Sequence, residues 1–88
     1  MNKKKLYIWK LATFLYSENM VMSGRELAEH LNRNKMLTKN GKKYKGNRGI
    51  YNLINQTWKW LYYDLKLKGE AKYVAKAFVK SNGKYAYK

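Results

Sequence analysis

The chain has 88 residues, which is enough for one small domain, and we expect a single domain over residues 1–88. Its 20 Lys and Arg residues face five acids, and this formal net charge of +15 favours a polyanionic partner, nucleic acid above all. The absence of Cys excludes a disulfide framework and thiolate metal sites.

The sequence contains no segment suited to a membrane. No apolar run approaches the roughly 20 residues that a transmembrane helix needs. The stretch from Leu6 to Tyr16 follows a basic start, but Lys10 interrupts it and no small-residue cleavage site follows, which argues against a signal peptide. We therefore expect a cytoplasmic protein, associated with a nucleoid or free in a host cell, without a membrane partner.

The first predicted element is a helix from Lys4 to Ser17. Apolar residues recur there at helical spacing, which is typical of a face that packs into a core. These residues are Ile8, Leu11, Ala12 and Leu15.

A capping box marks the start of the second helix. Ser23 and Glu26 form the S-x-x-E pattern, in which each side chain bonds the backbone amide of the other residue. The pattern predicts a helix that begins at Gly24 and ends in the polar run from Asn32 to Asn34.

The stretch from Met36 to Tyr51 is basic and contains no acid. Asn40-Gly41 is typical of a tight hairpin turn, and Leu37 and Tyr44 are expected to anchor it inward. Gly46-Asn47 predicts a second turn. A flexible tether would need none of these features, so we interpret the stretch as a shaped, basic surface loop.

A long helix is predicted from Arg48 to about Lys68, with Gly69 as its stop. Its outer face lacks the usual mixture of Glu and Lys. It holds amides, cations and a phenol, which are side chains that read base edges and bind phosphates, although a plain solvated face is the alternative. The outer residues are Arg48, Asn52, Asn55, Gln56, Lys59, Tyr63 and Lys66.

Two elements are expected after this helix. Apolar spacing predicts a further helix from Glu70 to about Phe78. Asn82-Gly83 then predicts a C-terminal β-hairpin, with Tyr85 and Tyr87 on one side of it.

Catalytic groups are scarce. His30 is the only His, the acids are scattered, and no phosphate-binding loop or metal-ligand cluster is present. We expect no enzymatic activity, no cofactor and no metal site. A lone His beside Glu29 is more often structural than catalytic.

By contrast, cations are plentiful between Glu29 and Asp64, where no acid occurs. Such a patch gives an affinity for nucleic acid that falls steeply with salt. Aromatic residues interleave this span, which suits either stacking on single-stranded bases or packing under the C-terminal hairpin. A Lys-rich protein from an AT-rich genome would explain the excess of Lys over Arg, but not the scarcity of acids.

The order of helix, capped helix, turn, amphipathic helix and hairpin resembles a winged helix-turn-helix DNA-binding domain of phage or mobile-element type. This resemblance implies an α+β, mainly α, domain of three to four helices with a C-terminal β-hairpin. It also implies that the long helix enters the major groove and that the hairpin contacts the DNA as a wing. The groove residues would be Arg48, Asn52, Asn55, Gln56 and Lys59, and the wing contacts would be Lys80, Asn82 and Lys84.

A shorter resemblance covers about twenty residues. The residues Leu27-Ala28, Leu31-Asn32, Leu37-Thr38, Gly41 and Tyr44 are similar to a stretch in the DNA-binding regions of large serine recombinases. The recombinase catalytic domain is absent, so that activity does not carry over. The connection between the second and third helices is also longer than in an ordinary helix-turn-helix, and a helix precedes the hairpin.

These expectations lead to a small double-stranded DNA-binding protein of phage or mobile-element type, acting as a transcriptional regulator or a recombination accessory factor. The long helix would lie in a groove, and the loop from Lys39 to Arg48 would contact phosphates. Its predicted phosphate contacts are Lys39, Lys42, Lys43 and Lys45. The alternatives are a phage-encoded inhibitor or subunit that binds RNA or a nucleic-acid-guided ribonucleoprotein complex, and an assembly protein of a larger machine. A homodimer is possible.

Overall fold

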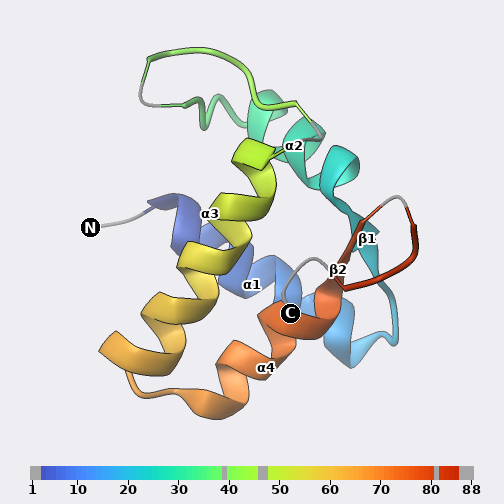
Figure 1. Cartoon of the computed structure of the whole chain (residues 1–88), viewed down its shortest axis with the longest axis vertical. Helices are drawn as coiled ribbons and strands as arrows, with labels where there is room; N and C mark the ends of the chain where they lie inside the picture. Colours follow the sequence, from blue (N-terminus) through green and yellow to red (C-terminus); the bar gives the residue numbers. More distant parts are fainter. Residues whose placement is uncertain (1–2, 39, 46–47, 81, 86–88) are drawn as a thin grey trace.

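A computed structural model of the chain describes residues 3–38, 40–45, 48–80 and 82–85. These ranges are mainly helical, with one small two-stranded sheet (Figure 1). The elements in chain order are α1 (Lys3–Ser17), β1 (Met22–Ser23), α2 (Gly24–Arg33), α3 (Arg48–Lys59), the π-helix η1 (Trp60–Asp64), α4 (Lys68–Ala77) and β2 (Phe78–Val79).

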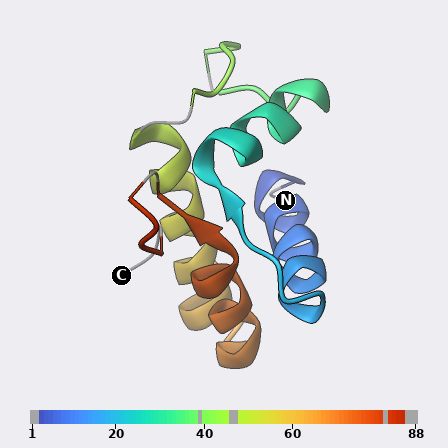
Figure 2. The same ribbon diagram turned by 90° about the vertical axis from the view of Figure 1, so that its right-hand side faces the viewer.

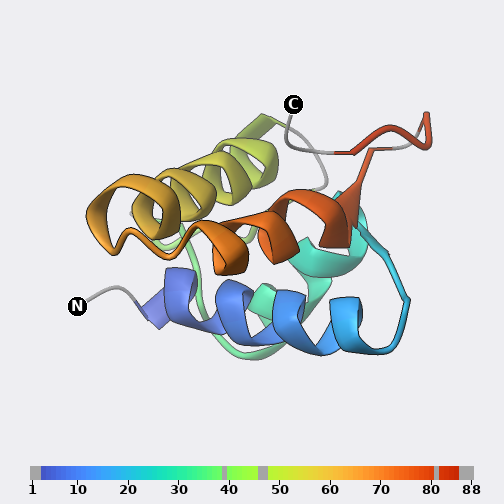
Figure 3. The same ribbon diagram turned by 90° about the horizontal axis from the view of Figure 1, so that it is seen from below.

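The core lies between α1, α3 and α4, which pack against one another (Figure 3), while α2 closes one end beside the start of α3 (Figure 1). The helical spacing predicted for the first element is confirmed, because Ile8, Ala12 and Leu15 of α1 are buried. Each helix contributes one apolar stripe to this core, as expected for amphipathic helices. The stripe of α3 continues into η1 through the buried Leu61.

The capping box predicted at the start of α2 is confirmed. The Glu26 amide donates to the Ser23 hydroxyl at 3.1 Å, and the Ser23 amide donates to the Glu26 carboxylate at 3.2 Å. The helix begins at Gly24, where α2 meets α3 closely. A Cβ at this position would lie 2.6 Å from the ring of Tyr51, so a larger residue at Gly24 would have to displace that ring.

The predicted end of the third helix was wrong. The α-helix stops at Lys59, and η1 carries the chain to Asp64, where the predicted helix continued to Lys68. The Leu65 amide then donates to the Trp60 carbonyl at 3.0 Å. Gly69, predicted as the stop, lies inside α4. The sharp reversal between the helices lets α4 pack back against α1 and α3, and this tertiary packing overrides the continuous local pattern.

The two strands do not form the predicted hairpin. β1 and β2 pair in parallel, with Met22 opposite Phe78 and Ser23 opposite Val79 (Figure 2). The chain does turn back at Asn82-Gly83, where Gly83 has a φ of +84°. This turn is closed by the Lys80 amide, which donates to the Lys84 carbonyl at 2.7 Å, and by a single antiparallel bridge between Val79 and Tyr85. Tyr87 lies outside the described residues.

The helices can be compared with the expectation that no segment spans a membrane. Within residues 3–80, apart from the gaps given above, each helix is too short or too polar to cross a bilayer.

Candidate nucleic-acid interface

The basic loop, residues 36–45, is fastened to α2 by one side chain. Asn32 donates to the Tyr44 carbonyl at 2.8 Å and accepts from the Tyr44 amide at 2.7 Å. An amide side chain that bonds both backbone groups of one residue replaces the partner strand that this segment lacks. The Tyr44 hydroxyl in turn accepts from Lys4 of α1 at 2.8 Å, so Tyr44 is held from two helices.

The tip of the basic loop is a closed turn. The Thr38 amide donates to the Lys42 carbonyl at 2.9 Å, and the Lys42 amide donates to the Thr38 hydroxyl at 3.1 Å. Gly41 has a φ of +75°, as the Asn-Gly pattern predicts. The predicted loop residues Lys39, Gly46 and Asn47 lie outside the described residues. The described lysines Lys42, Lys43 and Lys45 are exposed.

The outer face of α3 carries most of the predicted helix residues at the surface. The exposed residues there are Arg48, Asn52, Gln56 and Lys59. Asn55 differs from them, because it is half-buried and its side-chain oxygen is closed off from solvent without a hydrogen-bond partner among the described residues. This placement removes the Asn55 oxygen from the exposed face.

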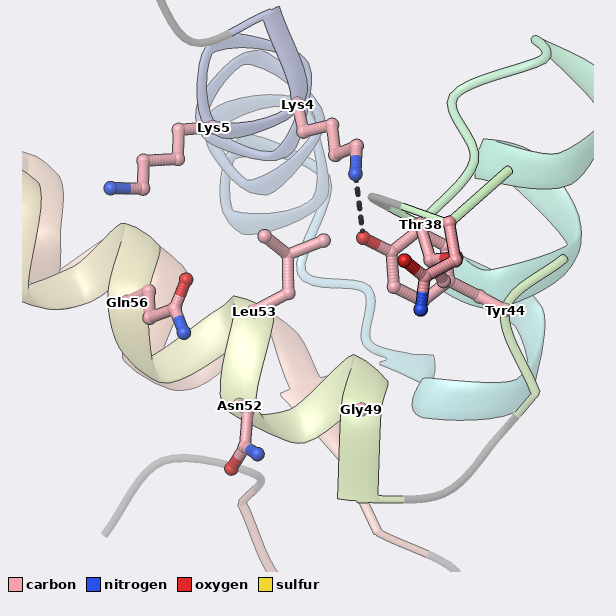
Figure 4. Close-up of a pocket in the computed structure, with 9 residues that line it drawn as sticks. Lys4, Lys5, Thr38, Tyr44, Gly49, Asn52, Leu53 and Gln56 are labelled. Carbon is pink, nitrogen blue, oxygen red and sulfur yellow. Dashed lines mark hydrogen bonds between the residues drawn. The ribbon is translucent and has the colours of Figure 1, made fainter. Parts of the chain in front are cut away.

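A cavity of about 410 Å³ opens between the start of α1, the outer face of α3 and the basic loop. Figure 4 shows Lys4 and Lys5 of α1 opposite Leu53 and Gln56 of α3, with Tyr44 at one end. Asn52 also lines this cavity. The cavity therefore joins ammonium groups, side-chain amides and an apolar floor.

A second cavity of about 290 Å³ continues along α3 toward η1 and shares Lys5 and Gln56 with the first. We call the two together the α1–α3 groove. Lys59 and Tyr63 line its far part, and Tyr63 is 61% exposed. Among the described residues that line this groove, Asp64 is the single acidic residue.

The electrostatics of the groove favour an anion. Neither α1 nor α3 has an acid in its first turn, so the partial positive charge at each helix start is not offset. Lys4, in the first turn of α1, and Gly49, in the first turn of α3, both line the groove. Two helix starts and two lysines thus converge on one concave surface.

The predicted C-terminal contacts lie on the other flank of α3. Lys80 is half-buried, and its ammonium lies 5.9 Å from the ring centroid of Tyr51, within cation–π range. Asn82 accepts from the Lys84 amide at 3.0 Å, which fixes the turn, and the Lys84 side chain is exposed.

The expectation about metal sites concerns the His, Asp and Glu side chains of the described residues. No group of three His, Asp or Glu side chains there could hold a metal ion. The Nδ1 atom of His30 lies 3.3 Å from the Tyr7 hydroxyl, which is a contact between α2 and α1.

Sequence reasoning missed Lys4 and Lys5 as site residues. It assigned the first helix to the core alone, and nothing in the local pattern shows which part of α3 the start of α1 will face. The run of lysines in the first turn of α1 was the available signal, because cations are unfavourable at a helix start and need another reason to be there.

No protein-family model, no curated protein sequence and no solved structure matches this chain significantly.

Proposed function

We propose that the protein binds double-stranded DNA through the outer face of α3, with the basic loop and the start of α1 on flanking phosphates. The observation that carries this proposal is the continuity of the surface. The exposed residues of α3, the α1–α3 groove and the basic loop adjoin one another. Among the described residues that line the groove, the single acidic residue is Asp64, at its far end.

The face of α3 supplies the groups that base reading needs. Asn52 and Gln56 are exposed amides one helical turn apart, and amides of this kind bond the edge of adenine. Arg48 and Lys59 stand at the two ends of the same face. A helix of 12 residues is about 18 Å long, which suits the major groove.

The basic loop supports a positioning role. Since Asn32 and Lys4 hold Tyr44, the ammonium groups of Lys42, Lys43 and Lys45 are presented from an anchored backbone. Ordering such a loop beforehand lowers the entropy lost on binding. Contacts of this kind fix the register of a protein on DNA and do not read its sequence.

The biological role remains the one that the sequence resemblance implies. A small winged-helix-like domain, similar in part to the DNA-binding regions of serine recombinases, would act as a transcriptional regulator or recombination accessory factor of a phage or mobile element. The turn containing Lys80, Asn82 and Lys84 would then be the wing, on the flank of α3 opposite the basic loop.

The first test compares random duplex DNA, single-stranded DNA and a structured RNA by fluorescence anisotropy across a salt series. We expect clear preference for the duplex. The double variant Lys42→Ala/Lys43→Ala should flatten the duplex salt slope by about 1.8, from two lost phosphate contacts. Preference for RNA, or equally weak binding to all three, would favour the ribonucleoprotein alternative instead.

A second test separates base reading from phosphate binding. After a preferred site has been selected from random duplexes, Gln56→Ala should reduce the preference for that site by about 1–3 kcal/mol and leave non-specific affinity nearly unchanged. Lys43→Ala is the matched control, because it should weaken all duplexes alike. An unchanged site preference in Gln56→Ala and Asn52→Ala would refute base reading by α3.

A further inference from the structure

A third cavity, of about 370 Å³, lies on the flank of α3 opposite the α1–α3 groove. Trp58 and Tyr62 form one side, with their rings stacked at 4.6 Å between centroids and 14° between planes. Both side chains are half-buried and line the cavity, so part of each ring faces it. Tyr85 of the C-terminal turn adds a third ring and is 50% exposed. We call this site the aromatic cavity.

A row of lysines from α4 forms the opposite side of the aromatic cavity. Lys68, Lys72 and Lys76 are exposed, line the cavity, and recur every four residues, so they follow one another by about 6 Å along one face of α4. The ammonium of Lys68 lies 5.3 Å from the ring centroid of Tyr62. The described lining contains no acid, and Ala75 between the lysines leaves the floor open.

We propose that the aromatic cavity is a second nucleic-acid site, which binds single-stranded DNA by stacking an unpaired base on its rings while the lysines of α4 contact the adjoining phosphates. Aromatic platforms beside a cationic track are the general means of binding single strands, since every base offers a π-face. The rings alone would be ordinary packing, but three lysines in a row beside them supply the charge complement of a strand.

The aromatic cavity shares none of its lining residues with the α1–α3 groove. The stacking site therefore stands independently of the duplex site, and only the choice of DNA over RNA rests on the proposed function. A protein with both sites would hold a duplex and an unpaired strand on the two flanks of one helix.

The test measures binding of short oligothymidine, oligouridine and a random duplex to the full chain across a salt series. Lys72→Ala/Lys76→Ala should flatten the oligothymidine slope by about 1.4 and leave the duplex slope nearly unchanged. Lys42→Ala/Lys43→Ala removes the same charge from the basic loop. It should flatten the duplex slope and leave the oligothymidine slope nearly unchanged. Equal effects of the two variants on oligothymidine would overturn the proposal, because they would show a general charge effect.

The stacking step has its own test. Tyr85→Ala should weaken oligothymidine binding about ten-fold, whereas Tyr16→Ala, a partly exposed tyrosine outside the cavity, should not. An oligothymidine that carries 5-iododeoxyuridine should crosslink on irradiation to Trp58, Tyr62 or Tyr85. Crosslinks confined to Tyr44 or Tyr63 would place the strand in the α1–α3 groove and overturn the proposal.

Three further results would also overturn the aromatic site. They are failure of oligothymidine to bind, tighter binding of oligouridine than of oligothymidine, and a shift from dimer to monomer in Tyr85→Ala without loss of oligothymidine affinity. The last result would make the cavity a surface between two copies of the chain. If the wild-type chain binds oligothymidine but does not bind the duplex, that result would instead count against the duplex proposal.

Discussion

Replacing Asn32 by Ala tests whether one side chain holds the basic loop in place. The change removes both hydrogen bonds to the Tyr44 backbone, at 2.8 and 2.7 Å. Each such bond contributes about 1 kcal/mol, so Asn32→Ala should lower the free energy of unfolding by about 2 kcal/mol. For a domain of this size, that loss corresponds to a fall in Tm of about 8–16 °C.

The assay combines urea unfolding with amide hydrogen exchange. In Asn32→Ala the Tyr44 amide should exchange faster, because its acceptor is gone. Duplex affinity should also fall, since a loop freed from α2 loses more entropy on binding. The matched control for the unfolding measurement alone is Asn52→Ala, an exposed amide whose removal should change stability by less than about 0.5 kcal/mol.

The reasoning fails if Asn32→Ala matches the wild-type protein in stability and the Tyr44 amide keeps its exchange rate. That result would mean that the contact between Lys4 and Tyr44 is sufficient to hold the loop.

Three further predictions concern the cap, the core and the groove. Ser23→Ala should lower the free energy of unfolding by about 1 kcal/mol in urea, because the start of α2 loses its cap; an unchanged midpoint would contradict this. Leu61→Ala should lower it by about 2–5 kcal/mol in thermal melts, because the Leu61 side chain is 0% exposed; a loss below about 1 kcal/mol would mean that the core refills the space. Lys5→Ala should reduce the duplex salt slope by about 0.9, and Lys10→Ala, on the same helix but outside the groove, serves as its control.

Local chemistry made the start of α2 predictable from the sequence. Ser23 and Glu26 bond groups within three residues of themselves, so the pattern needs no knowledge of the rest of the chain. The turn at Gly41 was predictable for the same reason, since the Asn-Gly pair carries its own backbone preference.

The end of α3 and the pairing of the strands depend on distant residues. Leu61 and Leu65 continue the helical spacing, and nothing local announces the wider turns of η1 or the reversal before α4. The strands have two residues each, too few for an alternating pattern, and Met22 finds its partner Phe78 only through the packing of the helices.

In the candidate site too, some residues were predictable from local periodicity and others depended on distant parts of the chain. Arg48, Gln56 and Lys59 could be assigned to the surface because helical periodicity separates them from the core face. Asn55 stands at the margin of that face, where the neighbouring element decides burial, so periodicity alone placed it in the same group as the exposed residues.

The parallel pairing of β1 with β2 also bears on how the chain folds. Met22 and Ser23 pair with Phe78 and Val79, so forming the pair closes a loop that contains most of the chain. The entropy of that closure opposes early formation, whereas α1 and α2 depend on local contacts. During synthesis, the α2 cap can form well before β2 leaves the ribosome. The two strands pair only afterwards, so the turn that bears Lys80 and Lys84 takes its place later than α2 does.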